Sequence, residues 1–156
     1  MSNALLKSAI KKLSIVDVFL IDCHTQRKEN YLPPHIFDDT SEINEQYKVQ
    51  FINHTKDSTT LKSNNKDLVN GVLYKYNVGF RFVNKENDED IKIEFKATFG
   101  VIYNVSEDIS DDELQSFGML NVGHNVWPYW RELASSMTSR LKIPDFVIPL
   151  YKINSN

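Results

Sequence analysis

Two long stretches of alternating apolar and polar residues constrain the fold of this chain more than any other feature. Residues 72–83 and 91–105 each carry an apolar side chain at nearly every second position. A period of two is the pattern of a half-buried strand. Because only the charged loop 84–90 separates the stretches, they predict an antiparallel hairpin with one apolar face. The residues of that face are Val72, Tyr74, Tyr76, Val78, Phe80 and Phe82, followed by Ile91, Ile93, Phe95, Ala97, Phe99, Val101, Tyr103 and Val105.

The first part of the chain predicts a helix and two more strands. Residues 2–13 have apolar side chains at helical spacing, and residues 14–25 are rich in β-branched and aromatic types. Residues 46–54 alternate and predict a half-buried strand. Residues 26–45 are polar and contain two adjacent prolines, so they predict a long connection. The polar residues 55–70 end in a turn signal and predict a second connection.

After residue 110 the pattern changes to helical spacing. Residues 110–113 have the form of a capping box, which predicts a helix of about two turns. Asn125 is the predicted N-cap of the next helix, and Pro128 suits its first turn. Residues 123–130 therefore start a buried amphipathic helix beside the sheet, and Pro144 ends it. Its apolar stripe consists of Trp130, Leu133, Ala134, Met137 and Leu141.

The predicted order is a helix, four strands, two helices and a short apolar tail at 146–151. Strands followed by helices indicate an α+β fold, with helices packed on one face of a four-stranded antiparallel sheet. Neither an internal repeat nor a linker divides the chain of 156 residues, so residues 1–156 predict a single domain.

Composition excludes several classes of function. With 18 Lys and Arg against 21 Asp and Glu, the net charge of −3 argues against non-specific nucleic-acid binding. No segment approaches the roughly 20 apolar residues that span a bilayer, and the first residues lack the apolar run of a signal peptide. The single cysteine, Cys23, excludes an intrachain disulfide framework and fits a cytoplasmic protein.

Residues typical of enzymes or metal sites do not gather anywhere in the sequence. The four histidines are not at metal-ligand spacing, and the five glycines are scattered instead of forming a phosphate-binding loop. The acidic pairs lie in predicted loops or at a helix start, where solvation or capping explains them. We therefore expect a non-enzymatic protein without a metal or a cofactor.

Aromatic residues make up 12% of the chain, and most of them fall on the predicted core face of the hairpin. The strand at 46–54 differs because polar segments flank it on both sides. If this strand is exposed, its apolar side is a binding groove or an oligomer surface. That side consists of Tyr47, Val49 and Phe51.

The second predicted helix carries the most specific motif. The sequence resembles the SecB family of export chaperones, which has an aromatic-Pro-Tyr-x-Arg-Glu run, then Ser-Met-x-Ser-Arg, then a proline after the helix. The spacing matches without gaps over about twenty residues, and a looser match in pattern extends from about Lys12 to Pro144. The matching residues are Trp127-Pro128-Tyr129, Arg131-Glu132, Ser136-Met137, Ser139-Arg140 and Pro144.

The resemblance implies an ATP-independent holdase that works in SecB-type protein export. Such chaperones are homotetramers, dimers of dimers, and bind unfolded or aggregation-prone client polypeptides in long hydrophobic surface grooves. The resemblance places the client groove at Tyr47, Val49 and Phe51, and the tetramer contacts at about residues 15–23 and 128–141. It implies that the helix side chains form either the oligomer interface or the core; these are Trp127, Tyr129, Trp130, Leu133 and Met137.

Three departures from the family pattern affect the expected partners. The family's second long C-terminal helix is expected to be absent or vestigial, and the connection at 26–45 is longer and richer in proline. Asp17 and Glu94 match two acidic positions that contact the translocase motor SecA, but Ile21 occupies a third. These departures fit divergent SecB-like proteins, some of which hold the antitoxin of a toxin–antitoxin module. SecA and an antitoxin are therefore both open as partners.

A different class of function is a small-molecule or lipid carrier, in which the aromatic face of the sheet closes over a ligand. An enclosed pocket in a monomer would favour a carrier, whereas a flat, open groove in a tetramer would exclude it.

Overall fold

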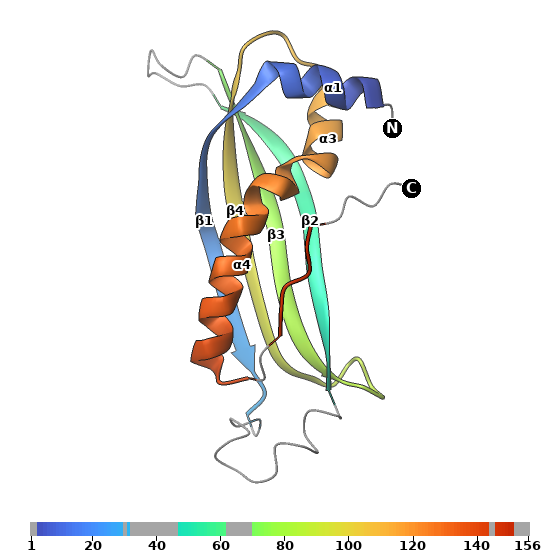
Figure 1. Cartoon of the computed structure of the whole chain (residues 1–156), viewed down its shortest axis with the longest axis vertical. Coiled ribbons are helices and arrows are strands. Elements are labelled where there is room, and N and C mark those ends of the chain that lie inside the picture. The colour runs from blue at the N-terminus through green and yellow to red at the C-terminus, as the bar shows by residue number, and fades with distance from the viewer. Residues whose placement is uncertain (1–2, 30, 32–46, 62–69, 144–145, 152–156) are drawn as a thin grey trace.

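The computed structural model describes residues 3–29, 31, 47–61, 70–143 and 146–151, and it has the predicted α+β architecture (Figure 1). Helices lie on one face of a single antiparallel sheet. The elements in chain order are α1 (Asn3–Lys12), β1 (Leu13–Arg27), β2 (Tyr47–Leu61), β3 (Gly71–Asn84), β4 (Ile91–Val105), α3 (Asp111–Leu120) and α4 (Val122–Leu141).

The sheet has the strand order β1-β4-β3-β2, with the predicted hairpin of β3 and β4 at its centre. Phe80 of β3 lies opposite Phe95 of β4 on one side and opposite Phe51 of β2 on the other. Directly opposite residues point to the same face, so this register gathers the aromatic rings beneath the helices. The face predicted for β3, from Val72 to Phe82, is buried at every second residue.

Strand β2 is longer than the sequence predicts. The expected strand ended at residue 54, but β2 continues to Leu61 through a bulge between Thr55 and Ser58. Its second half carries mostly polar side chains, so it lacks the apolar alternation from which the first half is predicted. The predicted connection at 55–70 therefore begins only after Leu61, and residues 62–69 lie outside the described part. Most of the other predicted connection, 26–45, lies outside it as well.

Strand β1 pairs with β4 and carries apolar residues on both of its faces. Register shifts after Ile15 and after Leu20 mark two irregularities that insert Val16 and Ile21. All four of these side chains are exposed, and so is Phe19.

Helix α3 begins with the predicted capping box and is one turn longer than predicted. The Ser110 hydroxyl accepts a hydrogen bond from the Glu113 backbone N–H at 3.3 Å, and the Glu113 carboxylate accepts one from the Ser110 N–H at 2.8 Å. The same carboxylate forms an ion pair with Lys12 at 2.9 Å, which joins the end of α1 to the start of α3.

Helix α4 begins at Val122, so the predicted N-cap at Asn125 is wrong. Asn121 takes the cap position without a side-chain hydrogen bond, and Pro128 lies inside the helix. The Asn125 side chain instead donates to the Tyr103 hydroxyl at 2.7 Å, because it faces the sheet. The helix ends at Leu141, where Lys142 adopts a left-handed conformation with φ of 53°.

The core lies between α4 and the two central strands. The Trp130 ring is stacked on Phe95, with ring centroids 5.9 Å apart and an interplanar angle of 13°. Phe80 contacts both rings, at 6.2 Å from Trp130 and 5.6 Å from Phe95. Among the described residues, no helix combines the length and apolarity that crossing a membrane requires.

Candidate peptide-binding surface

The three residues predicted to bind a client lie together on the face of β2 that carries the helices. Tyr47 and Val49 are half-buried and pack against the core, whereas the Phe51 side chain is 41% exposed. Tyr47 meets the ring of Tyr31 edge-on at 5.7 Å, and the Lys92 ammonium lies 5.7 Å from the Tyr47 ring centroid. This row of side chains forms an apolar border along the edge of the sheet.

A segment that the sequence indicates only as an apolar tail covers part of this border. We call residues 146–151 the strap. It runs between α4 and β2 over the aromatic face of the sheet (Figure 1). Phe146 contacts three aromatic rings, with centroids at 5.8 Å from Phe51, 4.8 Å from Phe80 and 5.5 Å from Phe82.

The other end of the strap packs against the first turns of α4. The Trp127 indole N–H donates to the Pro149 carbonyl at 2.9 Å. The Tyr151 ring lies 5.1 Å from the ring of Trp127 and 4.5 Å from the ring of His124. Burial raises the pKa of the Tyr151 hydroxyl, which is also hydrogen-bonded to Tyr76 of β3. Both ends of the strap are therefore fixed by aromatic contacts.

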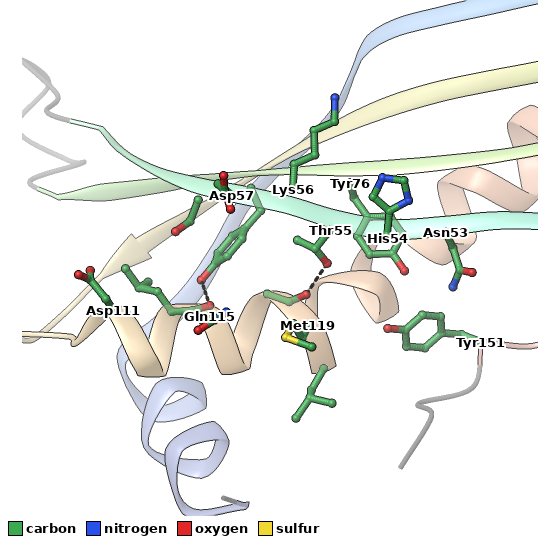
Figure 2. A pocket seen from close by; sticks show the side chains of 15 residues that line it. Asn53, His54, Thr55, Lys56, Asp57, Tyr76, Asp111, Gln115, Met119 and Tyr151 are labelled. Carbon is green, nitrogen blue, oxygen red and sulfur yellow. Dashed lines mark hydrogen bonds between the residues drawn. The ribbon is translucent and has the colours of Figure 1, made fainter. Parts of the chain in front are cut away.

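Beyond Tyr151, a cavity of about 790 Å³ lies between β2 and α3 (Figure 2). Two hydrogen bonds hold the elements together at its floor: the Thr55 hydroxyl donates to the Gly118 carbonyl at 2.6 Å, and the Tyr74 hydroxyl donates to the Leu114 carbonyl at 2.8 Å. Charged and apolar groups both line it, including Lys56 and Met119. The cavity lies next to the Tyr151 end of the strap, and residues from both faces of β2 line it, Thr55 and His54 among them.

The two acidic positions, Asp17 and Glu94, lie on the opposite face of the sheet and far apart. Asp17 of β1 is opposite Ile102 of β4, whereas Glu94 lies eight residues earlier on β4 (102 − 94). That spacing is about 26 Å at roughly 3.3 Å per residue. Glu94 is also paired with Lys96 at 3.0 Å. The structure thus does not gather these two carboxylates into one cluster.

The residues predicted for the oligomer interface or the core helix divide between two environments. Trp127 and Trp130 are buried, and Leu133 and Met137 are half-buried against the core. Tyr129 points away from the sheet and is 50% exposed. Four of the five therefore contribute to the core of a single chain, and Tyr129 belongs to the outer surface of α4.

Within the described ranges, no three His, Cys, Asp or Glu side chains come close enough together to hold a metal ion. The thiol of Cys23 is exposed on β1.

The fold is similar to that of a SecB-like chaperone. A solved structure of the Mycobacterium tuberculosis SecB-like chaperone Rv1957, in complex with a ChAD peptide from the Rv1956 HigA1 antitoxin, matches 96% of this chain and 98% of its own with a TM-score of 0.67. The two sequences are 14% identical, so this similarity establishes the fold. It confirms the predicted SecB-like architecture.

A protein of unknown function from Streptococcus agalactiae is more distant, with a TM-score of 0.41 and 14% identity over 89% of this chain and 98% of its own. No protein-family model and no curated protein matches the sequence.

Sequence reasoning missed the strap because six residues are too few to show a period. Two features of the sequence could have indicated it. Residues 146–151 are almost wholly apolar although they follow the last helix, and Gly123 stands at the start of α4 without the positive φ that would require a glycine. The structure explains the glycine, because a Cβ at this position would overlap the Tyr151 ring.

Proposed function

We propose that this protein is an ATP-independent chaperone that holds unfolded or aggregation-prone polypeptides on the apolar surface between β2, β3 and α4. The observation that carries this proposal is the strap, an extended apolar segment seated on the aromatic face of the sheet. A surface that accepts one such segment has the shape and chemistry to accept another.

Simple burial explains how such a surface binds many sequences. Each large apolar side chain that leaves water contributes about 1.5–3 kcal/mol, and the rings of Phe51, Phe80 and Phe82 offer contacts without directional demands. Binding therefore needs no energy source and little sequence specificity. Enzymatic chemistry has no part in this mechanism.

The proposed assembly is a homotetramer, a dimer of dimers, in the cytoplasm. The exposed apolar side chains of β1, together with the exposed Tyr129 ring on α4, support it because exposed apolar patches mark sites of protein contact. Both lie in the ranges 15–23 and 128–141 that the sequence resemblance indicates for subunit contacts.

A dedicated client of the antitoxin type is a second candidate beside general export. The similar chaperone Rv1957 binds a peptide from an antitoxin. Asp17 and Glu94 are about 26 Å apart at roughly 3.3 Å per residue, and this separation argues against a compact acidic contact for SecA. A small-molecule or lipid carrier is less favoured, because the strap occupies the aromatic face and charged residues, Lys56 among them, line the neighbouring cavity together with apolar ones.

Suppression of aggregation tests the proposal. Heat-denatured citrate synthase is followed by light scattering, without ATP, with increasing amounts of the wild-type protein or of Tyr47→Asp. We expect the wild type to suppress scattering and Tyr47→Asp to need several times more protein, because its charge lies on the client side of β2.

His54→Asp is the matched control, because His54 is exposed on the opposite face of the same strand and hydrogen-bonded to Asn77. It should act like the wild type. A wild-type protein that leaves aggregation unchanged at several-fold excess would contradict the proposed function.

A further inference from the structure

The strap has the features of a bound peptide as well as those of a core segment. Phe146 and Tyr151 contact rings of the sheet and of α4, and Ile148 is buried between them. Val147 and Leu150 point outward and are 77% and 71% exposed. Inward anchors separated by exposed residues are the pattern of an extended peptide in a groove.

Side-chain contacts hold the strap in place, and backbone hydrogen bonds contribute little. Among the backbone–backbone hydrogen bonds between described residues, none joins the strap to a strand or helix. The bond from the Trp127 indole to the Pro149 carbonyl is its polar link to α4, and Tyr151 adds one to Tyr76. Segments with few backbone hydrogen bonds open locally at a small fraction of the global unfolding free energy.

The strap also occupies a residue that the client would use. Phe51 lies in the predicted client groove, and its ring is 5.8 Å from the ring of Phe146. One side of an aromatic ring cannot be covered by two segments at once. A client therefore cannot cover the side of the Phe51 ring that faces Phe146 while the strap is in place.

Gly123 shows that the fold provides a seat for the strap. Glycine lowers the stability of a helix relative to alanine, yet it occupies the second position of α4. Tyr151 lies where the Cβ of any other residue would be. The helix thus contains a notch that fits one side chain of the strap.

We infer that the strap is an internal occupant of the client-binding surface, displaced by an extended peptide that carries bulky apolar side chains at the spacing of Phe146 and Ile148. This inference rests on the proposed chaperone function and adds its regulation. The strap shields the aromatic face when no client is present and competes with weak clients. The apparent affinity for a client is then the intrinsic affinity reduced by the fraction of molecules with the strap open.

Gly123→Ala tests the competition with a single methyl group. The probe is a fluorescein-labelled peptide with the sequence of residues 146–150 followed by serine in place of the tyrosine, so that it does not meet a Cβ at position 123, and with two lysines at each end. Its binding is measured by fluorescence anisotropy. Because the new Cβ displaces Tyr151, we expect Gly123→Ala to bind the peptide at least fivefold more tightly than the wild type. Leu150→Ser is the control; its side chain is exposed, and its affinity should equal that of the wild type.

A double variant separates loosening of the strap from any change in α4 itself. Tyr151→Ser should also tighten peptide binding, and adding Gly123→Ala to it should change the affinity less than twofold, because the clash is gone. Phe51→Asp is unsuitable here, since Phe51 contacts the strap and the proposed client site together.

Hydrogen exchange in the wild type tests displacement without any substitution. We expect the peptide to raise the exchange rate of the strap amides while the amides of β3 stay protected.

Equal affinities of the wild type and Gly123→Ala, with unchanged exchange in the strap, would overturn the inference even if aggregation is suppressed. Weaker binding by Gly123→Ala would also overturn it, because the strap would then be part of the binding platform. Failure of the chaperone proposal would look different: no suppression of aggregation and no peptide binding by any variant.

Discussion

Trp130 is the side chain that joins α4 to the sheet. It is 1% exposed and lies against Phe80 and Phe95 of the central hairpin. Large aromatic side chains in such a position provide both buried area and ring contacts, and their loss leaves a cavity that the surrounding strands cannot fill.

Trp130→Ala should therefore lower the free energy of unfolding by about 3–5 kcal/mol. Urea denaturation followed by circular dichroism measures the change. Glu132→Ala, two residues away on the exposed side of the same helix, should change it by less than about 0.5 kcal/mol. A loss below about 1 kcal/mol for Trp130→Ala would mean that the helix packs on the sheet with a different face.

Individual positions on α4 show where sequence reasoning succeeds. The apolar stripe predicted the inward direction of Trp130 and Ala134 because a helix repeats every 3.6 residues. Asn125 was assigned to the wrong role because Asn suits an N-cap and Pro128 suits a first turn. Tertiary contact decided otherwise: the Asn125 amide hydrogen-bonds to Tyr103, whose pKa burial raises to about 12.

At the scale of elements, Glu113 connects α3 to α1. Its carboxylate accepts hydrogen bonds from the backbone and side chain of Ser110 and pairs with Lys12 of α1. These contacts, with a further one from Ser8, lower the pKa of Glu113 from the ordinary 4.5 to about 2. The charged form is therefore the one that the folded state favours.

A pH series tests the contribution of Glu113 to stability. Because its folded pKa is depressed, the stabilisation is fully present above pH 4.5 and is lost as the pH falls towards 2. The difference in free energy of unfolding between the wild type and Glu113→Gln, from urea titrations between pH 2 and 7, should be constant above about pH 5 and shrink below it.

Glu107→Gln is the control, because Glu107 is exposed before the same helix. Its difference from the wild type should stay small and should not show the same fall. A difference for Glu113→Gln that is equal at pH 2.5 and pH 7 would show that the carboxylate charge does not stabilise the junction of α1 and α3.

Elements with a repeated pattern were predictable, and those shaped by their surroundings were not. The hairpin of β3 and β4 follows from its alternation, and the start of α3 follows from the capping box at Ser110. The second half of β2 was missed because its side chains are mostly polar and show no apolar period. The strap was missed because its position depends on Gly123 and on aromatic rings distant in the sequence.

At the scale of the whole molecule, β1 differs from the other described strands because it exposes apolar side chains on both of its faces. Within the described residues, β1 has a strand partner on one side only, and Phe19 and Leu20 expose apolar side chains on opposite faces. An open edge with apolar residues on both faces is prone to pair with another chain. This arrangement supports the proposed assembly through residues 15–23.

Charged residues at these two positions should therefore dissociate the assembly. We expect the wild type to have a mass in solution near four times the 18.1 kDa of one chain, and Phe19→Asp/Leu20→Asp to have a smaller mass, by light scattering at the same concentration.

His24→Asp/Gln26→Asp adds acidic residues at two exposed positions of the same strand outside the predicted contact, and its mass should equal that of the wild type. Circular dichroism checks that both variants keep the sheet. A monomeric wild type would contradict the tetramer. An unchanged mass for Phe19→Asp/Leu20→Asp would show that the subunit contact lies away from these two residues of β1.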